Sequence, residues 1–273
     1  MKLSVSTLGC PDWTLDRIAS RLPAYGYEGV ELRGLGPDLD VTLAPAFGTA
    51  SAASHTRRTL EDAGLVVCAL DSSCALAAPE GAARTSILDE GRRMIDLAAL
   101  LGAPCVRVFG GALPDGEARA SGVARAADAL LFLADHAERQ QADVSVVIET
   151  HDAFSTGAQV AEVLRQVSDH PHVGVLWDLH HPYRQGETPQ ETFAALGAYV
   201  KMTHVKDSRP RETYCLLGDG DIPVETMVGL LKGGGYDGWL SLEWEKRWVP
   251  ALADPEIAFP QYAARLGEYL ARL

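Results

Sequence analysis

The chain has no long hydrophobic run, few cysteines and a shortage of basic residues. No stretch approaches the roughly 18 consecutive apolar residues of a transmembrane helix, so we expect no membrane contact. The amino terminus, residues 1–9, has no long apolar segment and no cleavage signature, so we expect no secretory signal. The five cysteines are odd in number and form no Cys-x-x-Cys pair, which favours reduced thiols in a cytoplasmic protein.

The deficit of positive charge limits the partners of the protein. The chain has 24 lysine and arginine residues against 37 aspartate and glutamate residues, a formal net charge of −13. Binding to nucleic acid needs clustered basic residues that displace the counterions of the phosphates, so we expect no nucleic-acid partner. A local pocket can still bind an anionic small molecule.

The spacing of apolar residues along the chain predicts the fold class. Strand-like runs occur at Leu3–Thr7, Gly29–Leu32, Val66–Asp71, Cys105–Phe109, Val144–Glu149, Val173–Asp178, Val200–Val205 and Trp239–Glu243. Helix-like stretches such as Thr85–Leu101, Gly122–Gln140 and Gln159–Ser168 lie between them and have apolar residues at three- and four-residue intervals. We therefore predict a single α/β domain over residues 1–273, a (β/α)8 TIM barrel of the usual length. An open doubly wound sheet is the alternative, but it would rarely reach eight regular units in this length.

Four strand-like runs in the second half each end in a residue that can bind a divalent metal ion. These residues are Glu149, Asp178, His204 and Glu243. One strand-end carboxylate is usually an ion-paired rim residue, but four equivalent positions favour a shared site. The carboxyl ends of parallel barrel strands meet at one mouth, where barrel enzymes have their active sites. We therefore predict one metal centre, and three carboxylates with an imidazole suit manganese or magnesium, with cobalt or zinc as alternatives.

The residues around these positions form short motifs that resemble a known superfamily. They are Glu149-Thr-His151, Asp178-Leu-His-His181, His204-Val-Lys-Asp207, Leu217-Gly-Asp-Gly-Asp221 and Leu242-Glu-Trp-Glu245, together with residues 4–9 and 106–111. They resemble the xylose isomerase-like barrels, and within them the sugar phosphate isomerase/epimerase group that includes the ketose 3-epimerases. The resemblance covers nearly the whole chain, and the motifs identify the superfamily better than the substrate.

The resemblance implies roles for individual residues. The four strand-end residues would be the metal ligands, and Glu149 and Glu243 would also act as acid and base. His181 would contact substrate oxygens. A substrate-binding arginine is implied shortly after the histidine ligand, and Arg209 is our candidate, with Arg211 as the alternative.

Three further residues are candidates for contact with the substrate, each with a structural alternative. His151 either lines the site or is a loop histidine. Lys206 either binds a substrate oxyanion or pairs with Asp207. Arg107 lies within a strand, where a charged residue must be paired, and it either faces the mouth of the barrel or serves only in such a pair.

These residues predict an isomerase, either a sugar epimerase or an aldose–ketose isomerase. A metal ion would hold a carbonyl and a neighbouring hydroxyl while a proton moves at the adjacent carbon through a metal-bound enediolate. We expect a cytoplasmic protein that acts on a small-molecule sugar, and the sequence leaves open whether it is a monomer or a homo-oligomer. The first alternative is a metal-dependent dehydratase, a lyase of a keto-sugar or keto-polyol on the same fold.

Two remote alternatives come from other functional classes. A DNA-repair enzyme resembling endonuclease IV would need extra histidines at strands two to four, but those strands end in Glu31, Asp71-Ser-Ser and Phe109-Gly-Gly. In a non-catalytic sugar-binding barrel, the buried carboxylates would repel one another without a metal ion. The sequence therefore favours an enzyme.

Overall fold

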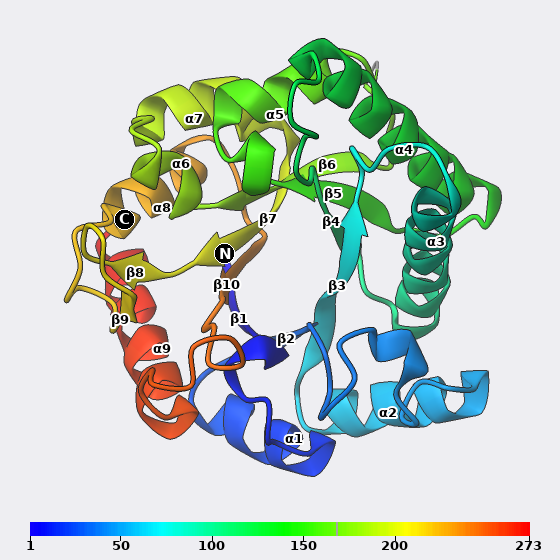
Figure 1. Ribbon diagram of the computed structural model, residues 1–273. Coiled ribbons are helices and arrows are strands. Elements are labelled where there is room, and N and C mark those ends of the chain that lie inside the picture. Colours follow the sequence, from blue (N-terminus) through cyan, green and yellow to red (C-terminus); the bar gives the residue numbers. More distant parts are fainter. Residues whose placement is uncertain (168) are drawn as a thin grey trace.

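Eight parallel strands form a closed barrel in the computed structural model, which describes residues 1–167 and 169–273 (Figure 1). The strands are β1 (Lys2–Ser6), β2 (Gly29–Leu32), β3 (Val66–Ala75), β4 (Cys105–Phe109), β5 (Ser145–Glu149), β6 (Val173–Asp178), β7 (Val200–Val205) and β10 (Trp239–Leu242). Their order around the barrel is β1-β10-β7-β6-β5-β4-β3-β2, and pairing of β1 with β10 closes it. This architecture confirms the predicted (β/α)8 TIM barrel.

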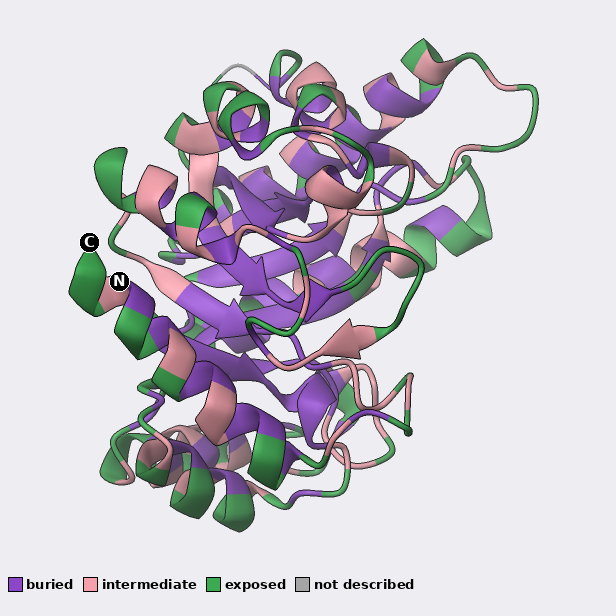
Figure 2. Cartoon of the chain, turned by 90° about the vertical axis from the view of Figure 1, so that its left-hand side faces the viewer, coloured by how far each residue is buried: buried purple, intermediate pink, exposed green. Residues whose placement is uncertain are grey.

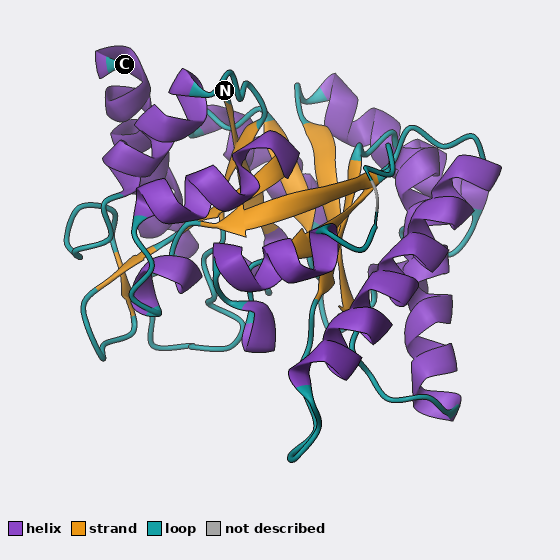
Figure 3. Ribbon diagram, turned by 90° about the horizontal axis from the view of Figure 1, so that it is seen from above, coloured by secondary structure: helices purple, strands orange, loops and turns teal. Residues whose placement is uncertain are grey.

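Helices surround the barrel (Figure 3). They are α1 (Leu15–Ala24), α2 (Ala50–Asp62), α3 (Ala82–Leu101), α4 (Arg119–Arg139), α5 (Gly157–Leu164), α6 (His181–Arg184), α7 (Pro189–Leu196), α8 (Val224–Gly233) and α9 (Pro255–Arg272). Short 3-10 turns lie at η1 (Thr7–Gly9), η2 (Val41–Leu43), η3 (Asp152–Phe154) and η4 (Gly197–Tyr199). The helices bury one face against the strands and expose the other (Figure 2). In the described part of the chain, none of them has the length and hydrophobicity that a membrane span requires.

The predicted helices agree with the structure to within a few residues at each end. The stretch predicted at 85–101 lies inside α3, and the one predicted at 122–140 overlaps α4. The stretch predicted at 159–168 overlaps α5 as far as Leu164, and its last residue, Ser168, lies outside the described residues.

Alternation along the strands decides which side chains point into the barrel. A compact apolar cluster joins Cys105, Val147, Leu176 and Met202 from four different strands, which can meet only in the interior. On β5, the neighbours of Val147 pack in the larger cluster against the helices. Because successive strand residues face opposite sides, Glu149 follows Val147 into the interior. The same alternation places these buried residues inside: Glu31, Asp71, Arg107, Asp178, His204 and Glu243.

Two features at the carboxyl ends of the strands differ from the predicted pattern. Strand β3 continues to Ala75, and its register against β4 shifts between Asp71 and Ala75. An antiparallel hairpin of β8 (Asp207–Ser208) and β9 (Tyr214–Cys215) follows β7. Residues of this hairpin have no apolar alternation, so the sequence did not predict it.

The Asp207 carboxylate holds the loop that carries this hairpin. It accepts hydrogen bonds from the backbone N–H groups of Ser208, Gly218, Gly220 and Ile222 at 2.8–3.2 Å. A Cβ atom at Gly220 would collide with the same carboxylate, which explains the glycine. The Leu217–Asp221 motif is therefore a structural element beside the barrel mouth.

Candidate metal centre

The structure brings the four predicted metal ligands together inside the barrel. Glu149 and Asp178 end β5 and β6, His204 is near the end of β7, and Glu243 directly follows β10. All four are buried, and one ligand atom from each lies within 4.8 Å of the others. The arrangement is the one expected from strand ends that meet at one mouth.

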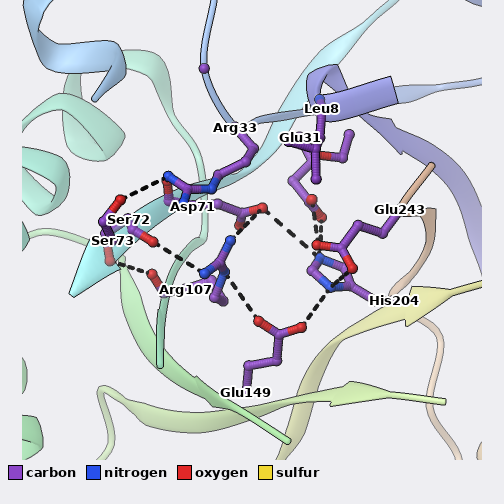
Figure 4. Close-up of polar contacts among 12 residues, drawn as sticks. Leu8, Glu31, Arg33, Asp71, Ser72, Ser73, Arg107, Glu149, His204 and Glu243 are labelled. Atoms are coloured by element: carbon purple, nitrogen blue, oxygen red, sulfur yellow. Dashed lines mark hydrogen bonds and ion pairs between the residues drawn. The ribbon is translucent and has the colours of Figure 1, made fainter. Parts of the chain in front are cut away.

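The imidazole of His204 lies between two sets of carboxylates (Figure 4). Its Nδ1 atom is 3.0 Å from Glu149 Oε1, 3.4 Å from Glu243 Oε2 and 3.9 Å from Asp178 Oδ2. Its Nε2 atom is 3.1 Å from both carboxylate oxygens of Glu31. Burial alone would lower the pKa of His204, but the charges of Glu243, Glu31 and Glu149 raise it well above its ordinary value, so both ring nitrogens carry a hydrogen here. A bound metal ion would take the place of the Nδ1 hydrogen, while Glu31 accepts the one on Nε2.

Glu31 is a residue whose importance the sequence did not reveal. From the sequence, Glu31 at the end of a strand-like run is either a substrate contact or a rim carboxylate. Its position in the strand could have indicated a role in the site. Glu31 is an interior residue of β2, and an interior carboxylate near the mouth needs a partner. Sequence alone does not say which of the interior groups that partner is.

The donor set fits a divalent cation. Oε2 of Glu149 and Oδ2 of Asp178 are buried and receive no hydrogen bond of normal geometry, although each lies within ion-pair distance of a basic side chain, Arg107 and Lys206 respectively. Buried carboxylates at this spacing repel one another unless a cation compensates their charge. Carboxylate oxygens with one imidazole nitrogen match the ligand preferences of manganese, magnesium, cobalt and zinc.

Lys206 places an ammonium group among the same carboxylates. Its Nζ atom is 2.8 Å from Asp178 Oδ2 and 2.9 Å from Glu245 Oε1, and it donates a hydrogen bond to Glu243 Oε2. Burial alone would lower the pKa of Lys206, but the charges of Asp178 and Glu243 raise it well above its ordinary value. The alternative pairing with Asp207 is not formed among the described residues.

Arg107 is held by two interior carboxylates. Its Nε atom is 3.4 Å from Glu149 Oε2, and its Nη2 atom is 3.4 Å from Asp71 Oδ2. Nη1 donates to the backbone oxygen of Ser72 at 3.1 Å. The residue is 1% exposed. Arg107 is therefore paired inside the barrel and contacts the predicted ligand Glu149 directly, and its contact with a substrate stays a prediction.

Two of the predicted substrate-contact histidines lie together at the edge of the centre. His181 Nε2 is 3.5 Å from Asp178 Oδ2, and its ring centroid is 4.7 Å from that of His151. Burial lowers the pKa of His181 below its ordinary value. Both side chains are partly exposed, at 21% for His181 and 32% for His151, so both line the opening. The adjacent His180 turns to Ser208 instead, with Nε2 at 2.9 Å from Oγ.

Arg209 is the predicted site residue that lies apart from the others. It directly follows β8, its side chain is 54% exposed, and it pairs with Glu212 at 3.5 Å. Its alternative, Arg211, is also exposed. Contact of either arginine with a substrate stays a prediction.

Comparison with known proteins identifies relatives of the chain. A family model described as Xylose isomerase-like TIM barrel matches residues 19–266. An inosose dehydratase of Clostridium botulinum (strain Eklund 17B / Type B) is 30% identical over 151 residues, covering 47% of this chain and 48% of that protein. The chain thus spans about half the length of the curated relatives it matches.

Solved structures with this fold cover the whole chain at low identity. The probable 3-DHS dehydratase AsbF of Bacillus anthracis superimposes with a TM-score of 0.77 at 19% identity, covering 98% of this chain and 99% of that one. The IOLI protein with a binding zinc atom superimposes with a TM-score of 0.81 at 17% identity, covering 100% and 99%. At such identities the likeness establishes the fold alone.

The comparisons overturn the isomerase class that the sequence predicted. The curated relatives are inosose dehydratases, and a structural neighbour is a probable 3-DHS dehydratase. Dehydratases are lyases, so these names contradict the predicted isomerase class. The error has a physical reason: the motifs carry the residues predicted to bind a metal ion, and one such set of ligands can serve both reactions. Whether a hydroxyl leaves next to the carbonyl depends on the substrate and its contacts, which the motifs do not specify.

Proposed function

The chain belongs to the xylose isomerase-like TIM barrel family, and on that premise we propose that it is a divalent-metal-dependent dehydratase of a keto-polyol. The convergence of Glu149, Asp178, His204 and Glu243 at one point carries the proposal. The dehydratase names of the curated relatives support the reaction type. Inosose and 3-DHS, which the relatives' names print, are the first compounds to test.

The four converging residues would hold the metal ion. When bound, a divalent ion supplies positive charge that polarises a carbonyl and makes the neighbouring carbon–hydrogen bond more acidic. We propose manganese or magnesium, with cobalt or zinc as alternatives, because the donor set contains three carboxylates and one imidazole.

Glu149 and Glu243 are the proposed proton-transfer groups. Burial alone would raise the pKa of Glu149, but the charges of Arg107 and His204 hold it below its usual range. Burial alone would also raise the pKa of Glu243, but the charges of His204 and Lys206 hold it well below its usual range. Both carboxylates are therefore ionised at neutral pH, and either can accept the proton from the carbon next to the carbonyl.

Elimination then needs a proton for the departing hydroxyl. Once a glutamate has accepted the proton from the carbon, its carboxyl group can donate a proton to the hydroxyl on the next carbon. The carbon–oxygen bond breaks, a carbon–carbon double bond forms, and the hydroxyl departs as water. The glutamate that accepts the proton from the carbon therefore also supplies the proton for the leaving hydroxyl, and no external acid is needed.

Three residues around the centre are proposed to contact the substrate. His181 and His151 line the opening, and each offers ring nitrogens for hydrogen bonds to hydroxyl groups. Lys206 supplies positive charge beside Asp178 and Glu243. The cytoplasmic location expected from the sequence stays a prediction, and so does the homo-oligomer that the sequence leaves open.

The test is a product analysis with defined metal content. Protein stripped with a chelator is reloaded separately with magnesium, manganese, cobalt or zinc, and incubated with inosose, 3-DHS and a panel of other keto-polyols. We expect a product lighter by one water, formed with at least one metal and absent from the stripped protein. Mass spectrometry and proton NMR detect it. A product of unchanged mass and altered configuration would contradict the dehydratase proposal.

A further inference from the structure

Arg33 is a nearly buried cation at the barrel mouth without a carboxylate partner. It directly follows β2 and is 6% exposed. Nη1 donates to Ser73 Oγ at 3.1 Å and points at the backbone oxygen of Asp71 at 3.5 Å. No ion pair joins Arg33 to a carboxylate within the described residues, whereas Arg107 and Lys206 each contact at least two.

A guanidinium in this position is unfavourable unless a ligand compensates it. Withdrawing a charge from water costs free energy, which an ion pair normally offsets. Burial and the neighbouring charge of Arg107 lower the pKa of Arg33 to about 10, although the charges of Asp71, Glu90 and Glu243 offset part of this effect. An anion bound against the guanidinium would offset both effects through its own negative charge. The hydrogen bonds to neutral oxygens fix its position without neutralising it.

Arg33 lies next to the predicted metal centre, with Asp71 between them. Figure 4 shows Arg33 and Arg107 on one side of Asp71, and His204 on the other. Asp71 Oδ2 is 3.4 Å from Arg107 Nη2 and 4.0 Å from His204 Nε2, so one carboxyl group separates the two regions. Ser73, which contacts Arg33, is exposed, so this side of the mouth is open to solvent.

We propose that Arg33, with the hydroxyl of Ser73, binds a carboxylate group of the substrate. This inference rests on the proposed function and narrows its substrate to a keto-polyol that carries a carboxylate. Within the described structure, Nε and Nη2 of Arg33 have no hydrogen-bond acceptor, and together they match the two oxygens of a carboxylate. One unpaired guanidinium balances one negative charge, which favours a carboxylate over a doubly charged phosphate.

Paired probes isolate the contribution of the carboxylate. 3,4-Dihydroxybenzoate and catechol share the two adjacent hydroxyls that can chelate a metal ion, and only the first has a carboxylate. We expect manganese-loaded protein to bind 3,4-dihydroxybenzoate about ten to a hundred times more tightly than catechol in isothermal titration calorimetry. In Arg33→Met the preference should fall to near unity, with the affinity for catechol unchanged. Arg33→Lys should keep part of it, because the charge remains.

Arg57→Met is the matched control, since Arg57 forms an exposed pair with Glu61 on α2. It should bind both probes like the unmodified protein. Absence of a preference in the unmodified protein, binding of neither probe, or an undiminished preference in Arg33→Met would overturn the proposal. If the phosphonate analogue of 3,4-dihydroxybenzoate binds more tightly than 3,4-dihydroxybenzoate itself, the carboxylate proposal is wrong and Arg33 binds a phosphate group.

Failure of this inference can be distinguished from failure of the proposed function. Elemental analysis of each sample reports metal binding independently of the probes. Stoichiometric metal without a carboxylate preference contradicts only the role of Arg33. If the protein binds no metal, benzoate, which lacks the hydroxyl pair, tests the arginine alone. We expect benzoate to bind the metal-free protein and to lose measurable affinity in Arg33→Met; equal binding would contradict the inference.

Discussion

Both carboxylate oxygens of Glu31 lie 3.1 Å from Nε2 of His204, so a residue of β2 holds a ring that belongs to β7 across the barrel interior. The opposite ring nitrogen faces Glu149 and Glu243. A carboxylate behind a metal-binding histidine fixes the orientation and the protonated nitrogen of the ring, and it makes the other nitrogen more basic.

Glu31→Gln should weaken metal binding without abolishing it. The amide has the same shape but no charge, so it orients the ring less firmly and the imidazole becomes a weaker ligand. Loss of such a partner typically costs about 10–100-fold in affinity. Titration of stripped protein with manganese measures the dissociation constant. Glu225→Gln, at an exposed pair with Arg272, is the control, and equal affinities in all three proteins would contradict the role of Glu31.

His181→Ala should retain its metal ion and lose activity. The ligand set is complete without His181, whose Nε2 is 3.5 Å from a carboxylate oxygen of Asp178. We expect kcat/KM on the best keto-polyol to fall by about tenfold or more, because the ring is proposed to donate a hydrogen bond to the substrate. His55→Ala, on α2, is the control. Loss of metal together with activity would show that His181 is itself a ligand, in the alternative cluster of Asp178, His180 and His181.

Lys206→Met should destabilise the metal-free protein more than the metal-loaded protein. The ammonium group compensates Asp178, Glu243 and Glu245 in the interior. Removing one partner of a buried ion pair costs about 3–5 kcal/mol, because the remaining charges stay uncompensated. A divalent ion replaces that compensation, so added manganese should raise the free energy of unfolding more in the variant.

Urea unfolding with and without manganese measures this difference. Lys232→Met, on the exposed side of α8, should respond to manganese like the unmodified protein. Equal stabilisation of Lys206→Met and the unmodified protein by manganese would show that the lysine and the metal ion do not share the carboxylates.

Glu149→Gln and Glu243→Gln separate metal binding from proton transfer. Each amide keeps an oxygen that can bind a metal ion but cannot act as a base at neutral pH. With excess metal and occupancy checked by elemental analysis, we expect kcat to fall about 10²–10⁴-fold in each variant. Glu212→Gln, at the exposed pair with Arg209, is the control. Full activity in either glutamine variant, with metal bound, would remove that residue from the proton-transfer step.

The strands and the four converging residues were predictable because their signals are local. A buried strand such as β6 is a continuous apolar run that ends at Asp178, and its bounds agree with the prediction. Alternation along each strand then decides which residue faces the interior. These signals require no knowledge of any other part of the chain.

The partners of the converging residues were not predictable because they depend on contacts between distant segments. The ring of His204 meets Glu31 from a strand 173 positions earlier, and several interior groups could have filled that place. Lys206 pairs with three acidic residues and not with its neighbour Asp207, because backbone N–H groups of a later loop occupy that carboxylate. Arg209 follows the histidine motif closely, but the hairpin turns it to the surface.

Metal content of Asp178→Ala tests the account most directly. Asp178 belongs to the cluster with Glu149, His204 and Glu243, and its Oδ2 atom is buried without a normal hydrogen bond. Purified protein is dialysed against manganese, then against buffer, and analysed by inductively coupled plasma mass spectrometry, with Asp96→Ala on α3 as an exposed control. We expect one manganese ion per chain in the unmodified protein and in the control, and loss of most of it in Asp178→Ala. Stoichiometric manganese in Asp178→Ala, or none in the unmodified protein, would contradict the metal centre and the function proposed from it.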